Sequence, residues 1–170
     1  MSDVSRPILN IDQLDYAREL SHGDKFRAKL APVGMKIGAR RLGYNVTRVP
    51  PGMRAFPLHS HHANEEMFFI LEGAGTLRYG RDEFPVRKGD FVACPPGGAD
   101  VAHQLVNSGD AELVYLAVST RVDTDVFSYP DSGKVGAIGG VQAGSTWPPV
   151  STFPAKFFVE ANAAEYWDGE

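Results

Sequence analysis

Glycine and proline interrupt this chain at short, nearly regular intervals, and that spacing limits the folds that it can adopt. The 170 residues include 18 glycines and 12 prolines. From about residue 36 onward, turn-forming clusters recur about every ten residues. The segments between them are short and rich in strand-favouring residues: 42–49, 66–73, 76–80, 91–98, 103–110 and 112–120. This pattern predicts an all-β, antiparallel sandwich or barrel.

Length and charge are consistent with one globular domain, 1–170. Hydrophobic residues make up 43% and charged residues 22% of the chain, which is enough apolar material for a core. The net charge of −4, with no basic run, argues against nucleic-acid binding, although a few local arginines could still hold a phosphate. No signal-peptide pattern and no apolar stretch of membrane-spanning length is present, and the single Cys94 cannot form an internal disulfide. We expect a cytoplasmic protein without a membrane partner.

The two ends of the chain give weaker signals than its middle. Residues 1–35 are expected to form an N-terminal arm in which 11–20 folds as a short helix capped by Asp12. The barrel is expected over about 40–120 and a C-terminal wrapping tail over 121–170. We expect one strand in the tail near 156–160 and an aromatic anchor at its end, formed by Tyr166 and Trp167. The glycine-rich sequence KVGAIGG indicates a flexible or bulged turn, since the spacing of a phosphate loop is missing.

Three histidines and a glutamate have the spacing of metal ligands. His59 and His61 lie two residues apart, so on a strand both imidazoles point to one face. A bend through 62–65 would bring the carboxylate of Glu66 beside them, and His103 begins a later strand. Three imidazoles and a carboxylate suit Zn, Ni, Fe, Mn or Cu, and on an octahedral ion they leave two positions open. Taken alone, the HxH pair favours a solvated surface loop over a metal site.

The residues around these side chains resemble the two sequence motifs of the cupin family. Residues 52–73, GMRAFPLHSHHANEEMFFILEG, are similar to the first motif, and 89–107, GDFVACPPGGADVAHQLVN, to the second. Two spacings depart from the family pattern. Gly52 lies one residue further from the first histidine, and five residues instead of two separate Gly97 from His103. The resemblance implies a cupin double-stranded β-helix, or jelly roll, that holds one divalent metal ion through four ligands: His59, His61, Glu66 and His103.

Neighbouring residues are assigned by their position relative to the motif. The interval to the last glycine of the first motif selects Glu66 as the ligand and leaves Glu65 pointing outward. Strand alternation then places Phe68 and Ile70 on the same inward face as Glu66. His62 faces away from the two histidine ligands, and a role in contacting the substrate or a metal ligand is the less favoured interpretation.

A few other polar residues invite a functional interpretation. Cys94 lies in an apolar strand without a basic neighbour in sequence, which indicates a buried, unreactive thiol. Asn107, the last residue of the second motif, is expected to close a turn with its side chain. Arg48, Arg54 and Arg78 could line the mouth and hold an anion, but solvated charges are the simpler expectation.

The fold does not determine the reaction. The stretches RRLGYNVTRVPPG, HQLVNSGDAELVYLAVSTR, YPDSGKVG and YWDGE also resemble a group of small bacterial cupins that are commonly labelled sugar-phosphate isomerases. The resemblance implies an isomerase of a small polar hydroxy-carbonyl compound, with the metal as Lewis acid. The general base and the phosphate anchor of such an enzyme are not identified. An Fe- or Ni-dependent dioxygenase and a non-catalytic binding or sensing cupin are alternatives. We expect a small polar or anionic ligand and a homodimer.

Overall fold

Short strands connected by turns make up almost all of the chain. The computed structural model describes residues 6–142, 150–163 and 168, and these form thirteen strands and three 3-10 helices. The strands are β1 Arg18–His22, β2 Phe26–Pro32, β3 Leu42–Val49, β4 Ser60–His61, β5 Glu66–Glu72, β6 Ala74–Tyr79, β7 Asp82–Arg87, β8 Phe91–Cys94, β9 His103–Val106, β10 Leu113–Thr120, β11 Asp125–Tyr129, β12 Lys134–Val141 and β13 Ser151–Val159. The 3-10 helices are η1 Ile11–Gln13, η2 Gly34–Ile37 and η3 Glu160–Asn162.

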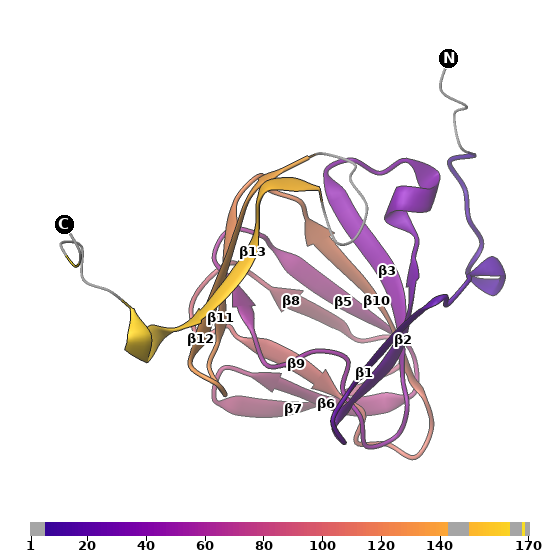
Figure 1. The fold of residues 1–170 in the computed structure, drawn as a ribbon. Helices are drawn as coiled ribbons and strands as arrows, with labels where there is room; N and C mark the ends of the chain where they lie inside the picture. Colours follow the sequence, from indigo (N-terminus) through magenta and orange to yellow (C-terminus); the bar gives the residue numbers. More distant parts are fainter. Residues whose placement is uncertain (1–5, 143–149, 164–167, 169–170) are drawn as a thin grey trace.

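The strands form three antiparallel sheets around a common interior (Figure 1). The largest has the order β1-β2-β3-β10-β5-β8, a second has the order β13-β12-β11-β4, and a third has the order β7-β6-β9. In the first sheet β10 lies between β3 and β5, which come from distant parts of the chain, as expected for a jelly roll. The all-β prediction is therefore confirmed. Among the residues that the structure describes, none of the helices has the length and hydrophobicity needed to span a membrane.

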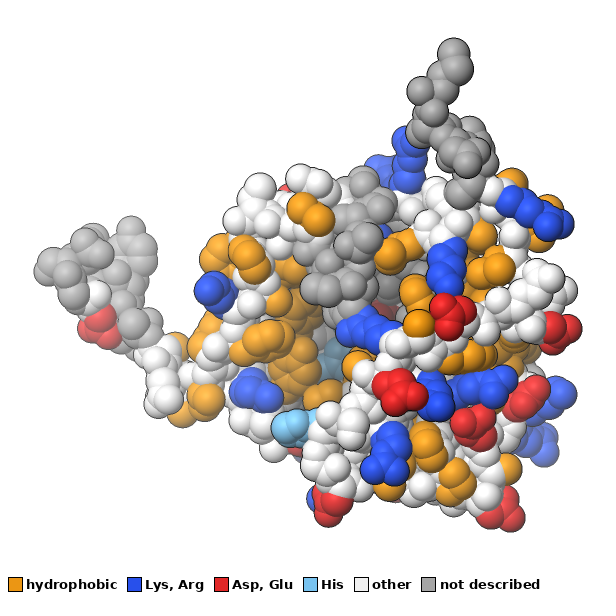
Figure 2. Space-filling model, turned by 45° about the vertical axis from the view of Figure 1, so that its right-hand side comes forward, with side chains coloured by type: hydrophobic (Ala, Val, Ile, Leu, Met, Phe, Trp, Pro, Cys, Tyr) orange, Lys and Arg blue, Asp and Glu red, His pale blue; other side chains and the backbone are white. Residues whose placement is uncertain are grey.

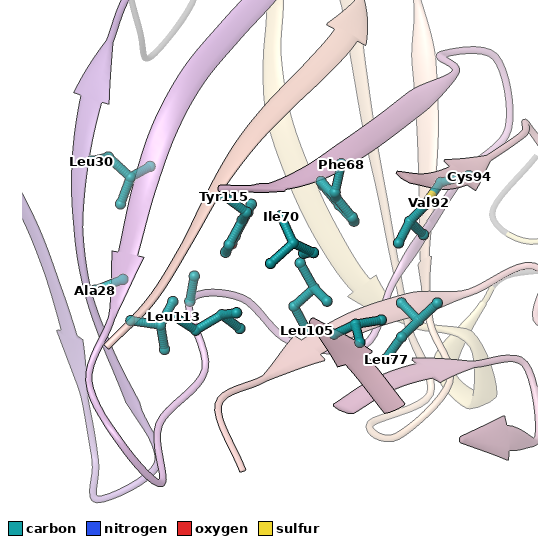
Figure 3. Close-up of a cluster of buried hydrophobic side chains, with 13 residues drawn as sticks. Ala28, Leu30, Phe68, Ile70, Leu77, Val92, Cys94, Leu105, Leu113 and Tyr115 are labelled. Carbon is teal, nitrogen blue, oxygen red and sulfur yellow. The ribbon is translucent and has the colours of Figure 1, made fainter. Parts of the chain in front are cut away.

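The core lies between the first and third sheets. Figure 3 shows side chains from several strands pointing into this interior, with Phe68 and Ile70 from β5 facing Leu77 and Leu105 from the third sheet. Alternation along β5 explains the arrangement, since Glu66, Phe68 and Ile70 share one face. The ring of Phe68 lies 5.6 Å from the ring of His103, so the apolar core reaches the predicted metal site.

The strands predicted over the middle of the chain are present. β3 has the predicted bounds, and β5, β8, β9 and β10 each lie within a predicted segment. Gly73, which directly follows β5, adopts a positive φ of 79°, and a Cβ there would meet the carbonyl oxygen of Glu112 at 2.4 Å. Only glycine allows the two backbone segments to approach this closely. The contact explains why the first motif ends in a glycine.

The helix predicted for residues 11–20 is wrong. Only Ile11–Gln13 is helical, and its cap is Asn10, whose side chain accepts a hydrogen bond of 2.8 Å from the backbone N–H of Asp12. The chain is extended by Arg18, where β1 begins and pairs with β2. An isolated helix of this length is marginal in water, whereas pairing with β2 supplies partners for the backbone along the whole strand.

The C-terminal segment forms three strands of a sheet where one strand was predicted, and the strand predicted near 156–160 overlaps β13. β11, β12 and β13 pair in sequence, and β11 also pairs with β4, which carries His61. β13 begins at Ser151, earlier than predicted. Figure 1 shows these strands standing together at one side of the molecule. The predicted anchor formed by Tyr166 and Trp167 lies outside the described residues.

The glycine-rich segment 134–140 lies within β12 and is not a turn. A register shift between Ala137 and Gly139 interrupts its pairing with β13, so the expectation of a bulge holds and that of a turn does not. A Cβ on Gly136 would lie 2.7 Å from the ring of Phe157 and 3.0 Å from the ring of Phe127. The glycine therefore lets aromatic rings from both neighbouring strands close over β12.

Candidate metal centre

The four predicted ligands come from three neighbouring strand ends. His61 ends β4, Glu66 begins β5 and His103 begins β9, while His59 lies just before β4. The backbones of His59 and His103 form an isolated antiparallel bridge. The two histidines that are furthest apart in the motifs are thereby neighbours in space, with ring centroids 4.9 Å apart.

All three imidazoles direct Nε2 toward one carboxylate oxygen. The Oε2 atom of Glu66 lies 3.1 Å from Nε2 of His103, 3.7 Å from Nε2 of His61 and 3.8 Å from Nε2 of His59. The ligand atoms of His59, His61 and Glu66 all lie within 4.8 Å of one another, so these three are positioned as ligands of a metal ion. His103 adjoins this group through its contact with Glu66.

Hydrogen bonds on the outer side of the rings orient two of the histidines. Nδ1 of His59 lies 2.9 Å from the carbonyl oxygen of Pro57, and Nδ1 of His103 lies 3.2 Å from that of Val101. A carbonyl oxygen only accepts, so each Nδ1 carries the proton and donates it. In the neutral ring, Nε2 then presents its lone pair to the centre, which is the tautomer that a metal ligand needs.

The Nδ1 atom of His61 is bonded to a side chain instead of a backbone carbonyl. This atom lies 2.6 Å from Oδ2 of Asp125, the first residue of β11. Asp125 is only 2% exposed, and its carboxylate also accepts hydrogen bonds from the backbone N–H of Ala63 and the side-chain amide of Asn64. The outward nitrogen of all three imidazoles is therefore bonded to an acceptor.

The protonation of these groups follows from burial and from their neighbours. Burial lowers the pKa of His59 to about 4, although the charge of Glu66 acts in the opposite direction. Burial also acts to lower the pKa of His61, but the hydrogen bond to Asp125 and the charges of Glu66 and Asp125 together outweigh it, and the pKa is raised. For Glu66, burial would raise the pKa, yet the hydrogen bond from His103, when its Nε2 is protonated, and the charges of the neighbouring imidazoles together lower it. Glu66 is therefore a carboxylate and His59 a neutral ring near neutral pH.

The arrangement fits a bound cation. With Nδ1 of His103 donating outward, the Nε2 lone pair of the neutral ring would face a carboxylate oxygen of Glu66 at 3.1 Å. Two lone pairs this close are stable only with a positive charge between them, which is either a proton or a metal ion. The side chains of His59 and His61 are each 16% exposed and that of Glu66 is 19% exposed, so a ligand reaches the centre from their side.

Aromatic residues of the second sheet line this side. The ring of Phe127 meets His61 edge-on at 5.1 Å, and the ring of Tyr129 stacks on His59 at 6.0 Å. Phe157 from β13 lies 6.0 Å from Tyr129. Figure 2 shows histidine atoms at the bottom of a hollow that hydrophobic and basic side chains border. We call Phe127, Tyr129 and Phe157 the aromatic wall.

The interior beneath the histidines has little room. A cavity of about 20 Å³ is lined by Phe56, Pro57, His59, Phe68, His103, Gln104, Leu105 and Tyr115. Such a volume is of the order of one water molecule. A ligand larger than water does not fit in this cavity, whereas the partly exposed side of His59, His61 and Glu66 is open to it.

The neighbouring motif residues lie as predicted. Glu65 is exposed, and its backbone N–H donates to the hydroxyl of Thr120. His62 is also exposed, and its Nε2 is 2.8 Å from Oγ of Ser128 on β11. The outward orientation of both side chains is confirmed.

Cys94 and Asn107 have the structural roles expected of them. Cys94 is 1% exposed, and burial raises the pKa of its thiol, so it is unreactive at neutral pH. The side-chain amide of Asn107 donates to the carbonyl oxygens of Val49 and Ala111, and its oxygen accepts from the backbone N–H of Gly109. These bonds close the turn between β9 and β10.

The three arginines considered as anion anchors have other partners. Arg78 donates two hydrogen bonds to the carboxylate of Asp131, at 2.8 Å and 3.0 Å, and one to Oε1 of Gln104. It is thus an ion-paired residue, contrary to the expectation of a solvated charge. The other two pack over aromatic rings, Arg48 over Tyr16 and Arg54 over Phe26.

Sequence analysis missed the contribution of β11 to the site. Asp125 orients His61, while Phe127 and Tyr129 line the ligand side. The segment 125–129, DVFSY, is rich in the strand-favouring residues Val, Phe and Tyr, which is a strand signal. That signal could have placed a strand here, but the contact with His61 depends on how β11 pairs with β4.

The fold and the centre together define a class of protein. A jelly roll whose interior brings imidazoles and one carboxylate together at strand ends is a cupin with a candidate metal site. Residues 45–119 match the family model described as Cupin domain, so the motif-bearing barrel is a cupin domain.

Curated relatives match the motif-bearing part of the chain. An uncharacterized protein of Methanocaldococcus jannaschii is 37% identical over 82 residues, which is 46% of this chain and 62% of that protein. The oxalate-binding protein of Thermotoga maritima is 31% identical over 71 residues, which is 42% of this chain and 55% of that protein. The chain thus spans between half and two thirds of the length of these relatives.

Two solved structures match over nearly their whole length. A presumed sugar phosphate isomerase of Acidithiobacillus ferrooxidans superposes with a TM-score of 0.79 at 25% identity, covering 96% of this chain and 98% of that one. A cupin-superfamily sugar phosphate isomerase of Silicibacter pomeroyi has a TM-score of 0.74 at 23% identity, covering 95% and 98%. The second similarity concerns the fold alone. Both extend beyond the cupin motifs into the N- and C-terminal segments.

Proposed function

We propose that this cupin binds one divalent metal ion through His59, His61, Glu66 and His103. The observation that carries the proposal is the common orientation of the three imidazoles, with every Nδ1 bonded outward and every Nε2 facing Glu66. Nitrogen and carboxylate oxygen are donors that suit Zn, Ni, Fe or Mn. A largely buried carboxylate is costly without a compensating charge, and the ion would provide it.

The charge of the site selects its ligands. Neutral imidazoles add no charge, and Glu66 cancels one of the two charges of the ion, so about one positive charge would remain. When bound, such an ion supplies a Lewis acid for the oxygen atoms of a ligand. The partly exposed side of His59, His61 and Glu66 gives the ligand access. A small anionic or chelating oxygen compound fits these conditions best.

We propose further that the protein is an isomerase of a small polar hydroxy-carbonyl compound such as a sugar phosphate. Support comes from the Acidithiobacillus ferrooxidans protein, which is similar over nearly the full length of both chains. The access side is consistent with this substrate class, since the aromatic wall offers a surface for a carbon skeleton beside the ion. Burial raises the pKa of Tyr129, so its hydroxyl stays protonated at neutral pH and would act as a hydrogen-bond donor and not as the base.

Binding without turnover is a second candidate. The oxalate-binding protein of Thermotoga maritima shares the motif-bearing segment, and a dicarboxylate is a chelating anion of the class that this site would favour. An Fe- or Ni-dependent dioxygenase is a third candidate, favoured by the aromatic wall, which suits a less polar substrate.

Metal content and product formation separate these functions. The protein, purified without a histidine tag, is expected to carry one transition metal ion per chain by elemental analysis. Conversion of aldose to ketose phosphates that is lost in His59→Ala would support the isomerase. Oxygen uptake after anaerobic Fe(II) loading would support the dioxygenase, and saturable oxalate binding without a product would support the binding module. Absence of bound metal after loading with each of the four ions would contradict the metal site itself.

We also propose that the chain forms a homodimer and functions in the cytoplasm. On β13, Phe153, Phe157, Phe158 and Val159 are between 41% and 56% exposed, and only one edge of this strand is paired among the described strands. An exposed apolar edge strand is an aggregation hazard that pairing with a second copy would remove. The location is tested by cell fractionation.

A further inference from the structure

We propose that Asp125 is a positioning residue for the metal centre. Its carboxylate holds His61 in the tautomer and orientation that a metal ligand needs. The inference rests on the proposed metal site. It adds a residue that lies on β11, outside the matched cupin segment 45–119 and outside both motifs.

The carboxylate of Asp125 is saturated with donors. Oδ2 accepts from Nδ1 of His61 at 2.6 Å and from the side-chain amide of Asn64 at 2.7 Å. Oδ1 accepts from the backbone N–H groups of Ala63 and Val126, both at 2.9 Å. The carboxylate thus receives four hydrogen bonds and is 2% exposed, so water contributes little to its solvation.

Only a carboxylate satisfies these four donors. An amide has a single accepting oxygen, and its NH2 group must then face either the two backbone N–H groups or the pair formed by His61 and Asn64. If the amide nitrogen faces His61, it donates to Nδ1, and the proton of the neutral imidazole moves to Nε2. Nε2 is the atom that faces Glu66, so this tautomer has no lone pair for a metal ion.

The same carboxylate also anchors the bend between two ligands. Asn64, which donates to Asp125, accepts at its Oδ1 from the hydroxyl of Thr120 and the backbone N–H of Val122. These two donors fix the orientation of the Asn64 amide. The bend from His61 to Glu66 is therefore held on one side by β11 and on the other by the end of β10, and the distance between the two ligands depends on both.

Asp125→Asn tests the inference because the change is isosteric and removes one acceptor. We expect Zn²⁺ affinity, measured by competition with a chromogenic chelator at fixed pH, to fall about 10- to 100-fold. The Co²⁺-loaded variant should also show altered d–d absorption bands, a signature of ligand geometry that a merely structural role would not change. Asp123→Asn is the matched control, since Asp123 is an exposed carboxylate two residues away. It should leave both measurements unchanged.

A second measurement does not depend on the folding of the variant. In the Zn²⁺-loaded wild-type protein, ¹⁵N NMR should show Nδ1 of His61 protonated and Nε2 bound to the metal. Wild-type affinity and spectrum in a folded Asp125→Asn protein, or a His61 that binds Zn²⁺ through Nδ1, would overturn the inference while the metal site stood. A wild-type protein that bound no metal would overturn the proposed function, and the inference with it.

Discussion

The backbones of His59 and His103 exchange hydrogen bonds, 2.8 Å from the N–H of His103 to the carbonyl oxygen of His59 and 3.3 Å in the opposite direction. Each histidine belongs to a different sequence motif, and this bridge joins the motifs at the candidate metal centre, in addition to the pairing of β5 with β8. Because the contact is made by the backbone, it survives replacement of either side chain. Substitutions of the ligands therefore test the chemistry of the site without removing the bridge.

Alanine substitutions should distinguish the metal ligands from neighbouring residues that do not bind the metal. We expect His61→Ala and Glu66→Ala to lower metal content from about one ion per chain to near zero, because either change removes a donor that faces the centre. His62→Ala should keep the metal, since its side chain is exposed and bonded to Ser128. Elemental analysis after gel filtration measures the stoichiometry. Equal retention in all three variants would contradict the ligand assignment.

Metal affinity should fall with decreasing pH. Burial acts to lower the pKa of His61, but the hydrogen bond to Asp125 and the charges of Glu66 and Asp125 together raise it above its ordinary value of 6.5. A metal ion can bind Nε2 only after the proton has left. Affinity should therefore be constant above that pKa and fall by about tenfold per pH unit below it. His59, with a pKa of about 4, adds no further loss until much lower pH. Chelator competition between pH 5.5 and 8.5 measures the slope, and a flat profile would contradict the prediction.

Removal of the Asn107 side chain should destabilise the fold. Its amide makes three hydrogen bonds to the backbone and is fully buried, so Asn107→Ala leaves buried polar groups without partners. We expect a loss of about 2–4 kcal/mol in the free energy of unfolding. Urea denaturation measures it, with the exposed Asp110→Ala as control. A loss no larger than that of the control would show that the turn closes without this side chain.

Cys94 should react with a thiol reagent only after unfolding. It is 1% exposed, and burial raises its pKa, so neither access nor the thiolate is available in the native state. Titration with Ellman's reagent should detect no thiol in buffer and one thiol per chain in denaturant. Rapid reaction of the native protein would contradict the burial of this strand.

If β13 forms the interface of the proposed homodimer, a charged residue introduced on this strand should dissociate the dimer. Phe158 is 49% exposed, so Phe158→Lys should leave the monomer folded but dissociate a dimer that uses this strand. Analytical ultracentrifugation gives the mass, and circular dichroism checks the fold. Phe84→Lys, a similarly exposed residue on β7, is the matched control. If both variants remain dimeric, β13 is not the interface.

The sequence by itself determined the strands of the middle of the chain and the set of candidate ligands. Period-two alternation shows which residues of a strand share a face, as for Glu66, Phe68 and Ile70, and glycine marks where the chain must turn. Both are local properties. The motif spacing then selected Glu66 over Glu65, and in the structure Glu66 lies beside the histidines while Glu65 is exposed.

Only the tertiary structure decided the ends of the chain and the surroundings of the ligands. Pairing with β2 placed Arg18 in a strand where local pattern predicted a helix, and pairing with β4 brought Asp125 to His61 across 64 positions of sequence. Contacts of this kind depend on which strand lies beside which. That is determined by the burial of the whole core, and no short window of sequence contains it.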